Sequence, residues 1–238
     1  MIAKRIILRL EPAGEHEAAL VRALRLAKAF HAELAARMIA DTRLATAVAV
    51  TGADLDRHLR RAETKLRRDV SGISTRENAR WTFEVVHCAG ILARDVMASD
   101  DLVAIELPRI EVSLADLREE IAEALAHARG VLLLPAELQT EHGPVVVVVD
   151  RRDQAKALIE QSDQIADALG VPLKLVERTP PPAPGRPERH ETADVATAVR
   201  RLDPLLAVID AADPIVQAFL ARPRFVREIA TPVLLLNA

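Results

Sequence analysis

Short apolar runs alternate along the chain with stretches whose apolar residues recur at helical spacing. The runs at residues 6–10 and 145–149 are each followed by an acidic residue, as is common where a buried strand reaches a turn. In the stretches after them, residues 18–30 and 154–169, apolar residues lie three and four positions apart, which predicts amphipathic helices. This alternation predicts an α/β fold with doubly wound parallel sheets that are covered on both faces.

The same order of segments occurs twice in the sequence. Four pairs match in order: residues 6–11 with 145–150, 27–34 with 166–173, 102–106 with 206–210, and 131–134 with 233–236. Matches at four pairs are better explained by duplication than by chance. We therefore predict two tandem domains of one fold, the first over residues 1–138 and the second over residues 143–238.

The two predicted copies differ in the middle. The first copy has a helix over residues 53–70 and a strand over residues 81–87 before its next helix at 91–98. The second copy has only the proline-rich residues 180–187 there, which favour extended chain and exclude a central strand. We predict a truncated second domain, with five strands in the first domain and four in the second. The proline run is a loop that replaces the missing helix and strand, or it could dock into an aromatic-lined groove.

Composition narrows the class of protein. Half of the residues are apolar and the net charge is −3, which argues against a general nucleic-acid binder. Cys88 is the only cysteine, so no disulfide and no cysteine-based metal site can form within one chain. No secretory signal is visible and the apolar runs are too short to span a bilayer. We expect a cytoplasmic protein that binds neither nucleic acid nor membrane.

Two segments resemble universal stress proteins. They are Ala-Lys-Ala-Phe-His-Ala-Glu-Leu at residues 27–34 and Ile-Ala-Thr-Pro-Val-Leu-Leu-Leu at residues 229–236. The resemblance implies an adenine nucleotide alpha hydrolase-like fold with strand order 3-2-1-4-5. It also implies that the closing strands, residues 131–134 and 233–236, pair across an intramolecular pseudo-dimer interface. A homodimer is a further possibility.

The predicted ligand site lies where the strand order reverses, outside the carboxyl ends of the first and fourth strands. Glu11 and Glu106 lie there in the first copy, and Asp150 and Asp210 in the second. By the resemblance, Asp150 matches the acid of the family's nucleotide pocket, and Glu11 is a longer substitute for it. Paired carboxylates could hold a cation, bond a ribose or share a proton. Alternatively, each acid marks a strand end and is solvated or caps the next helix.

The residues that would bind the phosphates of a nucleotide differ from those that the family carries. Nucleotide-binding members carry a glycine-rich loop after the fourth strand, whose N–H groups approach the phosphates. Neither residues 107–112 nor residues 211–214 contain a glycine, and Pro108 and Pro214 each lack an N–H. Arg109 could meet a phosphate or be a solvated loop residue. We therefore predict no cofactor: neither ATP nor AMP is expected as one, and ATP should bind weakly or not at all.

A row of basic residues is the remaining chemical feature. Arg57, Arg61, Lys65 and Arg68 recur at helical spacing, which is typical of a solvated helix face and otherwise indicates a basic docking patch. The sequence contains no nucleophile elbow, Walker loop or dinucleotide fingerprint. We expect a non-catalytic regulatory or interaction protein in stress response, with an unidentified protein partner. The alternatives are a nucleotide or small-molecule binding module that uses the strand-end acids, and an enzyme of the wider nucleotide-binding α/β group.

Overall fold

The structure is a computed structural model that divides into two compact units. It describes residues 2–12, 14–41, 55–88, 97–107, 114–135, 142–149, 155–177, 189–214, 216 and 231–237. One unit comprises Ala3–Glu106 with Ala115–Arg129, and the other comprises Leu107–Leu114 with Gly130–Ala238. The described residues form nine strands and five helices, and each unit is considered by itself.

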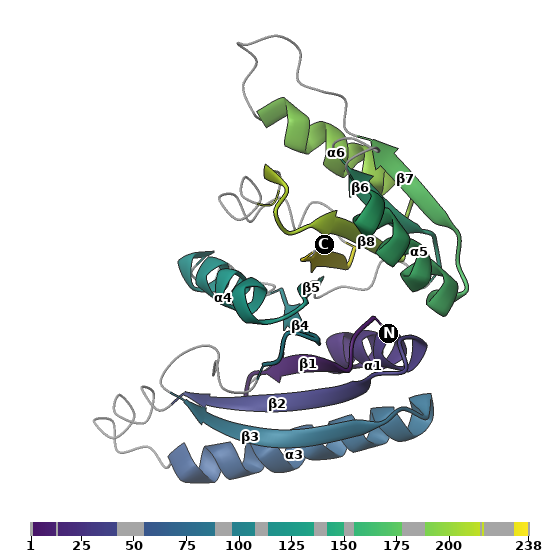
Figure 1. The fold of residues 1–238 in the computed structure, drawn as a ribbon. Coiled ribbons are helices and arrows are strands. Elements are labelled where there is room, and N and C mark those ends of the chain that lie inside the picture. Colours follow the sequence, from purple (N-terminus) through teal and green to yellow (C-terminus); the bar gives the residue numbers. More distant parts are fainter. Residues whose placement is uncertain are drawn as a thin grey trace. The chain divides into compact units, whose positions relative to one another are not determined.

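The first unit contains a parallel sheet of four strands in the order β3-β2-β1-β4 (Figure 1). Helices α1 and α3 pack against each other; α1 also contacts β1 and β2, and α3 contacts β2 and β3. Strands β1, β2 and β4 are mostly buried and mainly apolar, whereas Phe83 is the one described residue of β3 that is buried. The elements are β1 (Arg5–Leu10), α1 (Glu17–Ala29), β2 (Glu33–Asp41), α3 (Leu55–Glu77), β3 (Trp81–Cys88), β4 (Asp101–Glu106) and α4 (Leu114–His127).

A partly buried ion pair holds the amino ends of β1 and β4 together. Arg5 lies opposite Asp101 in the parallel register. Its Nε and Nη2 donate to the two carboxylate oxygens of Asp101 at 2.9 and 2.6 Å. The Asp101 Oδ2 also accepts a bond from the backbone N–H of Ala98 at 2.8 Å. A bidentate pair of this kind fixes both the orientation of the two side chains and the distance between them. It therefore supports one register of β1 against β4, and this register decides which residues are neighbours at the carboxyl ends of the two strands.

Helix α3 is longer than the sequence pattern predicts. The expected end at residue 70 precedes Ser71 and Gly72, yet the helix continues to Glu77. Ile73 and Ser74 are buried, and the Ser74 hydroxyl donates to the carbonyl of Val70 at 2.6 Å. Packing of this further turn offsets the cost of a glycine within the helix. The helix ends at Asn78, whose positive φ of 51° reverses the chain.

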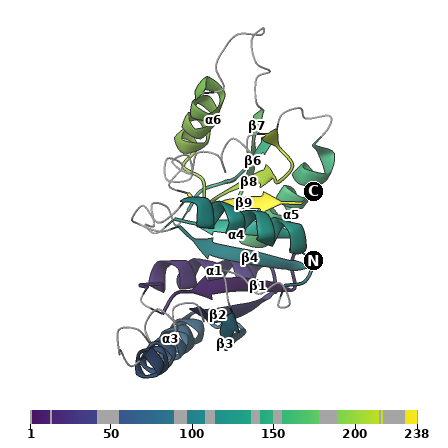
Figure 2. The same cartoon turned by 90° about the vertical axis from the view of Figure 1, so that its left-hand side faces the viewer.

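The second unit has a five-stranded sheet in the order β5-β9-β8-β6-β7. Strands β9, β8, β6 and β7 are parallel neighbours, and β5 pairs antiparallel with β9. Helices α5 and α6 lie on opposite sides of these strands (Figure 2), as a doubly wound sheet requires. The elements are β5 (Gly130–Leu134), β6 (Val145–Val149), α5 (Lys156–Leu169), β7 (Leu173–Glu177), α6 (Arg189–Arg201), β8 (Leu206–Asp210) and β9 (Val233–Leu236).

The doubly wound α/β class is confirmed, and so is the side-by-side placement of the two closing strands. Val131 of β5 stands opposite Leu235 of β9, and both side chains are fully buried. The five and four strands expected in the two halves of the sequence are all present. The tandem origin and the boundary near residues 138–143 stay predictions. The proline run and most of the predicted helices at 91–98 and from 213 onward lie outside the described residues.

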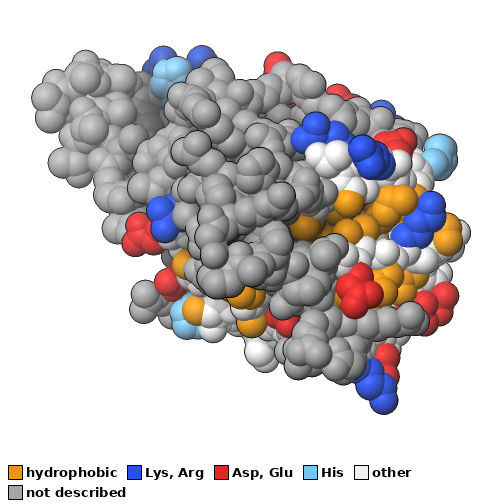
Figure 3. All heavy atoms as spheres, turned by 90° about the horizontal axis from the view of Figure 1, so that it is seen from above, with side chains coloured by type: hydrophobic (Ala, Val, Ile, Leu, Met, Phe, Trp, Pro, Cys, Tyr) orange, Lys and Arg blue, Asp and Glu red, His pale blue; other side chains and the backbone are white. Residues whose placement is uncertain are grey.

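Strand β7 is the edge of the second sheet. Its residues alternate between half-buried and exposed, in contrast to the buried β6 beside it. Figure 3 shows hydrophobic side chains among charged ones on part of the face seen from above in Figure 1. Lys174 and Glu177 are exposed on this strand, and charged side chains limit strand-to-strand association at such an edge.

The β5–β9 pairing makes a specific prediction about stability. Leu235→Lys places a charge between β5 and β8, where no partner for it is present among the described residues. We expect the free energy of unfolding to fall by several kcal/mol, on the order of the cost of an unpaired buried charge. Leu175→Lys on the edge strand β7 is the matched control and should cost far less. Urea unfolding measures both; equal stability of Leu235→Lys and wild type would contradict the pairing.

Candidate functional site at the carboxyl ends of β1 and β4

A buried histidine occupies the point where the strand order of the first sheet reverses. His16 precedes α1 as its N-cap residue, but its side chain makes no capping hydrogen bond. Instead, Nδ1 lies 2.6 Å from Oε2 of Glu106, the last residue of β4, which is 90 residues away in the sequence. The His16 side chain is only 6 % exposed. The imidazole therefore fills the place where sequence reasoning puts a ligand.

The second ring nitrogen of His16 is bound by the backbone that follows β1. Nε2 lies 2.9 Å from the carbonyl oxygen of Glu11, to which it donates when protonated, and 3.1 Å from the backbone nitrogen of Glu11, whose N–H donates to it when it is not protonated. Gly14 closes the turn, since its N–H donates to the same carbonyl at 3.2 Å. Gly14 also lies so close to the imidazole that a Cβ at this position would overlap the ring. The glycine therefore allows the turn to fold tightly onto His16.

A second ionic contact lies beside the histidine. Arg9 of β1 forms an ion pair with Glu120 of α4, and its Nη2 donates to Glu11 Oε1 at 2.8 Å. The Glu120 side chain is buried, and its Oε1 has no hydrogen-bonding partner in the described part of the chain. The Glu11 side chain is largely exposed. The cluster thus contains three carboxyl groups, one guanidinium and one imidazole.

Burial and neighbouring charges shift two of these groups. Burial lowers the pKa of His16, but its hydrogen bonds to Glu106 and to the Glu11 backbone, with the charges of both acids, outweigh burial and raise the pKa above 6.5. Burial also raises the pKa of Glu120, and Arg9 only partly offsets that rise. A protonated His16 donates from both ring nitrogens, to Glu106 and to the Glu11 carbonyl.

Only part of the predicted site set falls within the described residues. Glu11 and Glu106 meet around His16, Glu106 through its side chain and Glu11 through its backbone. Asp210 ends β8, where its Oδ1 accepts a bond from the N–H of Ala212 at 2.9 Å, as in an Asx turn. Arg109 and Asp150 lie outside the described residues.

Sequence reasoning missed His16, Arg9 and Glu120. The histidines are scattered in sequence, and nothing local links residue 16 to residue 106. One signal was present: a charged residue, Arg9, interrupts the apolar run of β1, and a buried charge needs a partner. No cluster of three or more histidine, cysteine and acidic side chains suited to a metal ion occurs in the residues that the structure covers.

Comparisons with known proteins support the fold. No family model and no curated protein sequence matches the chain. A crystal structure of a protein assigned provisionally to the universal stress proteins, from Pseudomonas aeruginosa UCBPP-PA14, matches with a TM-score of 0.58 and 15% identity, over 98% of this chain and 93% of that chain. The fold is of the universal stress protein type. At this identity the similarity speaks to the fold and not to activity.

The His16–Glu106 contact predicts how stability depends on pH. Since the folded pKa of His16 lies above its unfolded value, the stability gained from the imidazolium is complete below a pH of about 6.5 and is lost as the pH rises through the folded pKa. The stability difference between wild type and His16→Gln should therefore shrink as the pH rises above about 6.5. Chemical unfolding at each pH measures this difference.

The control for this prediction is His58→Gln, which changes an exposed histidine on α3. Its effect on stability should be small at every pH. A wild-type advantage over His16→Gln that stays constant, or grows with pH, would contradict the charged His16–Glu106 contact.

Proposed function

We propose that this chain is a non-catalytic interaction protein of the universal stress protein type, in which the nucleotide pocket of the first unit is closed. The observation that carries the proposal is the His16 imidazole, buried at the reversal point and bonded on both nitrogens. The proposal includes a cytoplasmic location and a protein partner. Consistent with it, none of the described helices combines the length and apolarity needed to span a bilayer.

Charge at the closed pocket also opposes a nucleotide. Glu11, Glu106 and Glu120 outnumber Arg9 and His16, and both cations already pair with these acids. A triphosphate brought into this partly desolvated place would meet carboxylates without N–H groups from a glycine-rich loop to offset them. No glycine occurs between residues 107 and 112.

The same contacts argue against acid–base catalysis here. A general base needs a nitrogen or oxygen within reach of the substrate. Both nitrogens of His16 are engaged and the ring is buried, so it cannot accept a proton from an external group without breaking the cluster. The contact with Glu106 is consistent with a structural role for this histidine.

The alternative of a small-molecule site at the strand-end acids gains no support from these contacts. The Glu106 carboxylate already bonds His16, and the Asp210 carboxylate already bonds the backbone of its own turn. A ligand at either acid would have to replace a contact that the fold supplies. The geometry therefore favours the interaction role over the binding-module role.

Calorimetric titration with ATP, ADP and AMP tests the proposal. We expect no saturable heat with or without Mg²⁺, because the pocket is filled and the phosphate donors are missing. Mg²⁺ alone is titrated as the control, since the cation could bridge acids and phosphates. A dissociation constant of about 10 µM or tighter for any of the three nucleotides, about −7 kcal/mol, would overturn the closed-pocket proposal.

A further inference from the structure

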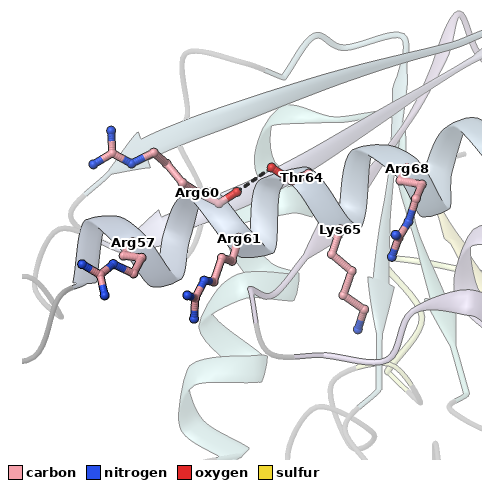
Figure 4. Close-up of a pocket in the computed structure, with 6 residues that line it drawn as sticks. All are labelled: Arg57, Arg60, Arg61, Thr64, Lys65 and Arg68. Atoms are coloured by element: carbon pink, nitrogen blue, oxygen red, sulfur yellow. Dashed lines mark hydrogen bonds between the residues drawn. The ribbon is translucent and has the colours of Figure 1, made fainter.

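Helix α3 of the first unit carries a basic face on its exposed side. The face consists of Arg57, Arg60, Arg61, Lys65 and Arg68 around Thr64, and all six residues are exposed. In Figure 4, Arg61, Lys65 and Arg68 extend from the same side of the helix and Arg60 from the other. Arg57 to Arg68 spans about 16 Å at 1.5 Å per residue. The six residues line a shallow hollow of about 610 Å³.

The opposite side of α3 packs against the rest of the first unit. Leu66, Val70 and Ile73 are buried. Arg67 remains exposed, but its guanidinium lies 4.8 Å from the ring centroid of Phe83 and pairs with Glu63 at 3.1 Å. Arg67 therefore has interaction partners within the first unit.

Three cations of the basic face have no ion-pair partner among the described residues. Arg60, Arg61 and Lys65 form no ion pair with any residue that the structure describes, and Arg68 has only Asp69 at 3.9 Å. Like charges four residues apart, such as Arg61 and Lys65, destabilise a helix. A row of this kind therefore costs stability in the isolated protein, and a negatively charged partner would relieve that cost.

A tryptophan adjoins the basic face. A second hollow, of about 410 Å³, shares Thr64 and Arg68 with the first and is also lined by Trp81 of β3. Trp81 is half-buried and is the only tryptophan of the chain. Tryptophan and arginine are the residue types most enriched among the energetically dominant residues of protein interfaces.

We propose that the basic face and Trp81 form a docking surface for an acidic, partly apolar segment of a partner protein. Arginine forks pair bidentately with carboxylates. Carboxylates at four-residue spacing on a helix lie about 5–6 Å apart, which is close to the spacing of Arg57, Arg61 and Lys65. An apolar side chain on the same segment would contact Trp81.

A protein segment fits this surface better than a nucleic acid or a membrane does. The half-buried acids Glu63 and Asp69 flank the row, and the chain as a whole carries a net charge of −3. A broad polyanion would meet these acids and the overall negative field, whereas a narrow acidic strip would meet only the row. The apolar side of α3 is packed within its own unit and has nothing to insert into a lipid layer.

The docking proposal rests on the proposed interaction role and assigns that role to a surface of the chain. The docking surface and the closed pocket are tested by different experiments, so one can be refuted without the other. ATP binding would refute the closed pocket and leave the surface intact, whereas failure of the peptide experiment below would refute the surface and leave the pocket closed.

The probe is a peptide of about 15 residues made only of Glu, Leu and Ala, with Glu at every fourth position of a helical face. A second peptide has Gln in place of each Glu. Because Trp81 is the only tryptophan, its fluorescence reports on peptide bound at this surface. The altered protein is the triple variant Arg61→Glu, Lys65→Glu, Arg68→Glu. The matched control is Lys156→Glu, Lys174→Glu, Arg200→Glu, which makes the same charge change at exposed positions of the second unit.

We expect the acidic peptide to shift Trp81 fluorescence saturably and the Gln peptide not to. Affinity should fall at least about tenfold in the α3 variant, stay unchanged in the control variant, and weaken as salt rises. Circular dichroism checks that each variant is folded. If the α3 variant unfolds, the double variant Arg61→Gln, Lys65→Gln replaces it. Its affinity for the acidic peptide should also fall, but by less, because two charges are removed and none is reversed.

Several outcomes would overturn the docking surface. They are no saturable binding of the acidic peptide, equal binding of the Gln peptide, or equal affinity in wild type and the α3 variant. Tighter binding of single-stranded RNA, or of vesicles containing phosphatidylserine, than of the peptide would also overturn it.

Discussion

The parallel pairing of β1 with β4 is the constraint on which the candidate site depends. Arg5 and Asp101 fix the two strands at their amino ends, so Leu10 and Glu106 emerge at the same edge of the sheet. That register brings Glu106 to His16 across 90 residues of sequence. Once the strands are paired, the acid after β1, the acid that ends β4 and the histidine that precedes α1 meet at one point.

That meeting point is filled from within the chain. In an open α/β sheet the reversal point is the usual place for a ligand, and here an imidazole and a guanidinium pair with three carboxyl groups. The proposed docking surface lies instead on α3, where the arginines and lysine of the basic face are exposed and Trp81 is half-buried. The first unit therefore combines a filled strand edge with an exposed, positively charged helix face.

The sequence predicts the sheet far better than it predicts the cluster. Buried parallel strands are apolar runs, so β1, β4, β6, β8 and β9 are visible locally, and strand-end acids necessarily share an edge. The partners of His16 and Arg9 come from β4 and α4, and no local pattern encodes a contact over such separations. The end of α3 was missed for a related reason, because the burial of Ile73 and Ser74 that extends it depends on tertiary packing.

The protonation state of His16 in the presence of nucleotide tests the closed pocket most directly. Nitrogen-15 NMR of the histidine side chains resolves whether each ring nitrogen carries a proton. At pH 6 or below, about half a unit under the ordinary pKa, the account predicts protons on both nitrogens of His16. It also predicts that the signals do not move when ATP and Mg²⁺ are added at millimolar concentration. A neutral ring, or His16 signals that shift saturably with ATP, would contradict the account.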